Sequence, residues 1–253
     1  MGRRSSVIIR NIWHYWLVAL SFLTCIPTPR YLYQTGDLSQ AAIFFPVVGG
    51  LIGAFNYGLY YLLRIFKVGN WFMALVLVLF PLILTRGLHL DGWADVCDAL
   101  FSTTDVNRRR EILKDSRLGT HGVTGIFFLL SFKTAALVEN FLPIFLIVAP
   151  MAGRTAALVI GGLFHPFYQG KKSLGEEFIG RIPRWSMGVW LIIMILFPFF
   201  GKGNYYPIKA AFIFFVGWLF GKLTEKSFQG LNGDTAGAAI ELIETLFLYL
   251  GRI

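Results

Sequence analysis

Residues 41–63 read AAIFFPVVGGLIGAFNYGLYYLL and carry no charged side chain over their whole length. A helix needs about 20 such residues to cross the hydrocarbon core of a bilayer. Mostly apolar blocks recur along the rest of the chain, at 71–88, 122–138, 141–165, 185–200, 208–221 and 236–250. Because the bilayer offers the backbone no hydrogen-bond partner, chains cross it as helices or closed barrels. The blocks predict an all-α fold, a polytopic integral membrane helical bundle of about seven transmembrane helices.

The composition argues against an ordinary soluble domain. Hydrophobic residues make up 56% of the chain and charged residues 15%, whereas soluble domains are about 45–50% apolar and about 25% charged. The two cysteines, Cys25 and Cys97, lie far apart without metal-ligand spacing, so no disulfide framework is predicted. No internal repeat or low-complexity tract divides the sequence. We expect a single membrane-embedded catalytic domain over residues 1–253.

The net charge of +9 indicates membrane orientation rather than nucleic-acid binding, because cytoplasmic loops collect Lys and Arg. If the N-terminus is inside and residues 12–29 do not span, most basic residues fall on the cytoplasmic side. We therefore predict an interfacial or re-entrant segment at 12–29 in a multi-pass protein of the cytoplasmic (inner) membrane. The polar segments 91–121, 166–184 and 223–235 then share the cytoplasmic face, where we expect the active site.

Three aspartates follow one another at helical spacing in the first of these segments. Asp91, Asp95 and Asp98 stand at i, i+4 and i+7, which puts them on one narrow face of a helix. Carboxylates crowded at the end of an apolar span repel one another and are costly to desolvate. A hard divalent cation such as Mg²⁺ relieves both costs. The alternative is a solvated helix face, but no acidic residue between Asp91 and Asp98 lies off the stripe.

A basic cluster follows the aspartates directly. Lys114 and Arg117 are i, i+3 neighbours that could hold one phosphate from two sides, and the residues from Asp115 to Gly119 are typical of a tight turn that fixes Arg117. Arg110 ends a triple arginine that could contact either substrate or anionic lipid. Acidic side chains beside basic ones are typical of sites for phosphoryl transfer. The sequence has no Walker-type glycine loop that would suggest nucleotide hydrolysis.

Further candidates lie on either side of this region. Asp234 and Glu241 are seven residues apart on one predicted helical face, with small residues between them. Asp234 could instead be only a helix cap, which would not explain a Glu241 within an apolar helix. His89 precedes the aspartates, where it could orient a carboxylate, accept a proton or be structural.

These residues resemble the signature of the cobalamin synthase family, the adenosylcobinamide-GDP ribazoletransferases. The resemblance runs from about residue 20 to 245 and is most specific in its centre. The matching motifs are GLHLDGWAD at 87–95 with Asp98, EILKDSRLG at 111–119, FLTCIPTP at 22–29, PVVG at 46–49, and Gly233-Asp234-Thr235 with Gly237, Ala238 and Glu241. Asn232 stands where the family pattern has threonine.

The resemblance implies an activity. The family joins adenosylcobinamide-GDP to α-ribazole, or to its 5′-phosphate, and releases GMP in a reaction that needs Mg²⁺. Carried onto this chain, Asp91, Asp95 and Asp98 would hold the metal on the diphosphate. Lys114 and Arg117 would stabilise the leaving GMP. One of the aspartates or His89 would be the general base.

The same resemblance extends the predicted sites beyond the aspartate stripe. Asp234 and Glu241 join the predicted metal-binding residues. The predicted substrate- and phosphate-binding residues are Lys114, Arg117, Asp115, Arg110, Asp234 and Thr24. Expected partners are the two small-molecule substrates and membrane lipid, with a homo-oligomer or a complex with other cobamide-assembly enzymes as further options.

Two other functions remain open on the sequence. A CDP-alcohol phosphatidyltransferase also sets aspartates at i, i+4, but its pattern has Ala-Arg after the first Asp-Gly, whereas Ala94 is followed here by Asp95. A secondary transporter would more naturally place its acids near the middle of the bilayer. Here the acids gather at one predicted face beside a basic loop.

Overall fold

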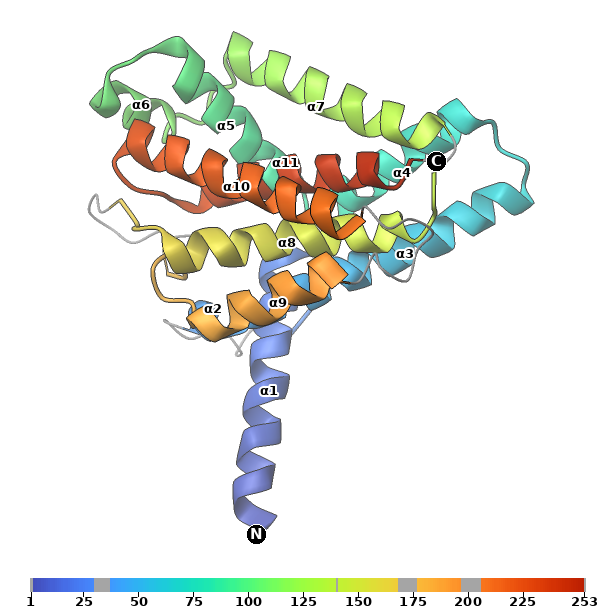
Figure 1. The fold of residues 1–253 in the computed structure, drawn as a ribbon, viewed down its shortest axis with the longest axis horizontal. Helices are drawn as coiled ribbons and strands as arrows, with labels where there is room; N and C mark the ends of the chain where they lie inside the picture. Colours follow the sequence, from blue (N-terminus) through green and yellow to red (C-terminus); the bar gives the residue numbers. More distant parts are fainter. Residues whose placement is uncertain (1, 30–36, 140, 168–176, 197–205, 253) are drawn as a thin grey trace.

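The computed structural model describes residues 2–29, 37–139, 141–167, 177–196 and 206–252, and over these ranges the regular structure is helical. Figure 1 shows the helices packed into a bundle from which the first helix projects. The elements are α1 (Gly2–Leu23), α2 (Asp37–Ala41), η2 (Ala42–Phe44), α3 (Phe45–Ile65), α4 (Asn70–Leu84), α5 (Leu88–Ser102), α6 (Val106–Ile112), α7 (Thr120–Val138), α8 (Phe145–Leu163), α9 (Arg184–Leu196), α10 (Tyr206–Phe228) and α11 (Gly233–Leu250).

Four helical segments of the described chain are long and apolar enough to cross a membrane: Asp37–Ile65, α7, α8 and α10. The pair α4 and α5 would count as a fifth if it were one broken span. The predicted all-α membrane bundle is thereby confirmed, while the predicted count of seven spans is not. Block 185–200 runs past the end of α9 into residues outside the described ranges, and block 236–250 lies in α11, which contains two buried glutamates.

Block 71–88 is helical as far as Leu84, where α4 ends, and α5 leaves α4 at 95°, so this pair is a broken span or a re-entrant loop. The break comes from two successive left-handed residues, Arg86 with φ 55° and Gly87 with φ 68°. Glycine adopts this conformation freely, whereas for a residue with a side chain it costs about 1–2 kcal/mol. The break exposes the α4–α5 turn and sets the direction of the helix that bears the aspartates.

The N-terminal segment predicted at 12–29 is mainly helical, since α1 covers Gly2–Leu23. Most of α1 projects from the bundle (Figure 1), and its last turns, around Val18 and Leu23, are buried in the core. The backbone N–H of Cys25 donates to the carbonyl of Leu84 at 2.7 Å. The end of α1 is therefore fastened to the end of α4, at the edge of the α4–α5 break.

Close helix crossings bring the backbones of the bundle together around α8. A Cβ on Gly53 of α3 would lie 2.5 Å from the carbonyl oxygen of Leu146, and one on Gly49 would lie 2.4 Å from that of Pro150. Small residues at such crossings let helices approach closely in a bilayer. On its other side α8 meets α11, where a Cβ on Gly153 would lie 2.9 Å from the oxygen of Ile240. Helix α8 is thus held between α3 and α11.

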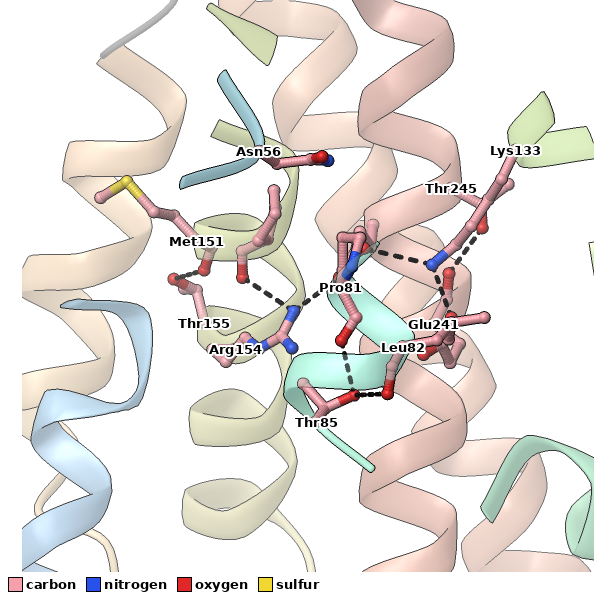
Figure 2. Close-up of polar contacts among 12 residues, drawn as sticks. Asn56, Pro81, Leu82, Thr85, Lys133, Met151, Arg154, Thr155, Glu241 and Thr245 are labelled. Carbon is pink, nitrogen blue, oxygen red and sulfur yellow. Dashed lines mark hydrogen bonds and ion pairs between the residues drawn. The ribbon is translucent and has the colours of Figure 1, made fainter. Parts of the chain in front are cut away.

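Four buried charged side chains connect α7, α8 and α11 (Figure 2). Lys133 Nζ lies 2.6 Å from Glu241 Oε2 and 3.1 Å from Glu244 Oε1, and Arg154 Nη1 lies 2.5 Å from Glu244 Oε2. Two cations and two anions balance, so the cluster has no net charge. Burying a single ion would be far more costly than burying this balanced set.

The same cluster reaches the broken end of α4. It borders a small cavity of about 20 Å³ that Asn56 of α3 and Thr85 also line. Asn56 Nδ2 donates to the carbonyl of Leu77 at 3.0 Å, and Thr85 Oγ1 donates to that of Pro81 at 3.0 Å. The carbonyls of Leu77 and Pro81 in α4 therefore have hydrogen-bond partners inside the bundle, as polar backbone away from water requires.

The crossing of α3 and α8 predicts opposite effects for two glycines of one helix. Gly53→Ala should lower the thermal stability in detergent, because overpacking typically costs about 1–3 kcal/mol. Gly58→Ala is the matched control, since a Cβ there meets nothing within 4 Å and alanine favours the helix. Equal melting temperatures for the two variants would contradict the proposed close approach.

The buried charge cluster predicts a strong asymmetry between two glutamates. Glu244→Gln should destabilise the protein by about 3–5 kcal/mol, because Arg154 loses its ionic partner inside the bundle. Glu111→Gln, which removes an exposed partner of Arg108, should change stability little. Thermal or denaturant unfolding of both variants in detergent tests this, and a Glu244→Gln protein as stable as Glu111→Gln would refute it.

Candidate active site

The three predicted polar segments meet at one end of the bundle. Arg110 donates from Nε to the carbonyl of Phe228 at 2.7 Å and from Nη2 to that of Gln229 at 2.9 Å, which ties the first segment to the third. The backbone N–H of Leu231 donates to the backbone carbonyl of His165 at 2.8 Å, which ties the third segment to the residues beside the second. Residues 168–176 of that second segment lie outside the described ranges.

The aspartate stripe lies on α5 as its spacing predicts, but its three members differ in exposure. Asp91 is exposed, Asp95 is half-buried and Asp98 is buried. Asp95 faces the like charges of Asp234, Asp91 and Asp98. Asp234, far away in the sequence, therefore joins the stripe.

A close crossing of α5 and α11 explains how Asp234 reaches the stripe. A Cβ on Gly92 would lie 2.8 Å from the carbonyl oxygen of Asp234, so only glycine allows this approach. Asn232 caps α11 in a capping box with Thr235, and its Nδ2 donates to Asp234 Oδ2 at 2.6 Å. The helix cap is thus Asn232, which leaves Asp234 in the first turn beside the α5 carboxylates.

Asp98 has a different environment from the other two aspartates. Its Oδ2 accepts from the backbone N–H of Gly119 at 2.8 Å, and its Oδ1 accepts from that of Gly122 at 2.8 Å. These amides begin α7, where the unpaired N–H groups and the helix dipole favour an anion. Asp98 therefore joins α5 to α7 and fixes the loop that precedes α7.

A cavity of about 510 Å³ opens beside Asp91. Its walls come from the end of α1, the α4–α5 break, α5, the loop before α7 and α7 itself; they include Phe22, Arg86, Asp91, Leu118 and Ile126. This volume lies within the usual range of ligand pockets. Arg86 lines this cavity but was missed by the sequence-based prediction.

The predicted basic residues are distributed unevenly around this cavity. Arg117 is exposed and forms a two-pronged ion pair with Asp115, with Nη2 to Oδ2 at 2.6 Å. The side-chain and backbone hydrogen bonds from Arg117 lower the pKa of Asp115 to about 2. Lys114 is also exposed. Arg110 binds the carbonyls of Phe228 and Gln229 at the end of α10, and its contact with substrate stays a prediction.

Three other predicted residues lie apart from the aspartates. Glu241 is buried against Lys133 in the charge cluster, which explains its place in an apolar helix without a metal. His89 is buried where α5 faces Gly237 of α11, and its Nε2 has no hydrogen-bond partner among the described residues. Thr24 is buried, and its Oγ1 donates to the carbonyl of Leu20 at 2.7 Å at the end of α1.

The carboxylates can form an open metal site rather than a closed one. Within the described ranges, no three acidic, histidine or cysteine side chains are placed to enclose a metal ion. However, Asp91, Asp95 and Asp234 supply hard oxygen donors that repel one another. Mg²⁺ typically takes only one or two carboxylates and completes its shell with water and substrate phosphates. This donor set therefore fits Mg²⁺ bound together with a phosphate ester.

Comparison with known proteins identifies the family. The chain is 36% identical over 244 residues to the adenosylcobinamide-GDP ribazoletransferase of Escherichia coli (strain K12). The match covers 92% of this chain and 97% of that protein. A protein of the same name from Shigella boydii serotype 4 (strain Sb227) shows the same identity and coverage. No solved structure matches the chain. Because residues 15–251 also match the family described as cobalamin-5-phosphate synthase, this chain belongs to that family.

Proposed function

We propose that this membrane protein is an adenosylcobinamide-GDP ribazoletransferase. A hydroxyl of α-ribazole, or of its 5′-phosphate, attacks the phosphorus that is bonded to cobinamide, and its proton passes to one of the aspartates of the site. The new oxygen–phosphorus bond forms as the bond to the GMP phosphate breaks, and GMP leaves. The observation that carries this proposal is the gathering of Asp91, Asp95 and Asp234 beside a cavity in a chain of this family.

The residue roles follow from the positions of the carboxylates. Asp91, Asp95 and Asp234 would hold Mg²⁺, which neutralises charge on the diphosphate when it is bound. Asp98 holds the start of α7 and thereby the loop that carries Arg117. Lys114 and Arg117 on that loop are exposed and would meet the leaving GMP. Glu241 and His89 are left out of the metal-binding and catalytic sets because they lie away from these carboxylates.

We propose that the site end of the bundle faces the cytoplasm at the inner membrane. The basic residues around α6 and the loop before α7 support this orientation. The predicted seven spans require α11 to lie within the bilayer, which its neutralised glutamates allow. Residues 1–253 would act as one catalytic domain surrounded by lipid, alone or as a homo-oligomer or a complex with other cobamide-assembly enzymes.

The decisive experiment follows GMP release by the purified protein in nanodiscs. Adenosylcobinamide-GDP and α-ribazole are supplied with Mg²⁺, and the same assay is repeated after chelation. We expect GMP and adenosylcobalamin to form in equal amounts with metal and not without it, because the carboxylates alone cannot neutralise the diphosphate. Folded protein that releases no GMP would redirect the search to lipid-type phosphotransferases.

The aspartates provide a mutational test of the same site. Asp91→Asn and Asp95→Asn should each lower kcat by about 100-fold or more, as expected when an electrostatic contact to the transition state is lost. Asp105→Asn is the control, because Asp105 only caps α6 and asparagine caps helices equally well. Full activity in both site variants would show that the metal-binding assignment is wrong.

A further inference from the structure

Arg86 occupies a position that its backbone does not favour. It stands between α4 and α5 with φ 55°, directly before Gly87, which is also left-handed. Glycine would adopt this conformation without a steric penalty, so the presence of arginine here points to a role for its side chain. Strained residues of this kind concentrate at ligand sites, where the surrounding structure holds them.

The guanidinium of Arg86 is held at the edge of the cavity beside Asp91. Its Nη2 donates to the carbonyl of Thr24 at 3.0 Å, and that carbonyl lies just past the end of α1. Because arginine carries five N–H donors in a rigid planar fork, this single bond orients the group and leaves donors available. Arg86 is also exposed, so a ligand in the cavity can reach it.

The composition of the cavity wall favours a ligand-binding role for Arg86. Of the described residues that line it, Arg86 is the basic one and Asp91 the acidic one, and apolar side chains such as Phe22, Leu118 and Ile126 surround them. Apolar walls lower the local dielectric and strengthen a charge-assisted hydrogen bond. Neither Arg110, which binds the α10 carbonyls, nor Arg117, which pairs with Asp115, is among the residues that line this cavity.

We infer that Arg86 binds a phosphate of the nucleotide diphosphate on the cobinamide substrate, in the cavity that Leu118 of the Arg117 loop also lines. This inference rests on the proposed function and adds a substrate-binding residue to it. The Thr24 carbonyl orients the fork. Thr24, just past the end of α1, would thus contribute through its backbone, because its hydroxyl donates to the carbonyl of Leu20. The phosphate would sit between Arg86 and the carboxylate of Asp91, where the metal is proposed.

The test compares three substitutions of Arg86 in the full-length protein in nanodiscs. Arg86→Gly suits the left-handed backbone and removes the cation, Arg86→Gln removes the charge, and Arg86→Lys keeps a point charge without the fork. Arg64→Gln is the control, since Arg64 is exposed in the last turn of α3. Binding of adenosylcobinamide-GDP and of adenosylcobinamide, which lacks the diphosphate, is measured beside GMP release.

We expect Arg86→Gly and Arg86→Gln to raise KM for adenosylcobinamide-GDP by about 10- to 100-fold, because each loses a hydrogen bond to a charged group, and a free energy of that kind corresponds to such a factor. Their melting temperatures and their binding of adenosylcobinamide should match the wild type, and Arg86→Lys should fall between. Unchanged KM in the Gly and Gln variants would overturn the inference alone, as would an equal loss of binding for both ligands. Wild-type protein that releases no GMP would overturn the proposed function as well.

Discussion

The charge of Glu244 is neutralised by Lys133 of α7 and Arg154 of α8, and the arrangement of the bundle depends on these contacts. An unpaired ion within the bundle would cost several kcal/mol, so α7, α8 and α11 must come together in one register. That register fixes where α11 begins. It therefore also fixes Asp234, which lies against Gly92 of α5.

The aspartates of the site have two different roles. Asp98 is stabilised by the backbone N–H groups that begin α7, so its charge serves to join two helices. Asp91, Asp95 and Asp234 instead bring like charges close together at the site. A cation bound together with a phosphate would relieve this repulsion.

The break between α4 and α5 supplies the other half of the site. Irregular backbone in a membrane protein is tolerated where it lines a cavity or is buried in protein. The α4–α5 break is partly buried and partly lines a cavity. Thr85 satisfies the carbonyl of Pro81, while Arg86 lines the cavity beside Asp91. The end of α1 closes this region through Cys25 and Leu84. The strained turn, the cavity and the acids are therefore parts of one local arrangement.

The sequence by itself determined the helical membrane class, the stripe at Asp91–Asp98 and the family, because apolar length, helical periodicity and local motifs are properties of short segments. Only the tertiary structure decided which partner each charged group would have. Glu241 shares the helical face of Asp234 yet binds Lys133, Asp98 caps α7, and Arg86 enters the cavity. These pairings join residues far apart in the chain, so they depend on how the helices cross, which no local pattern specifies.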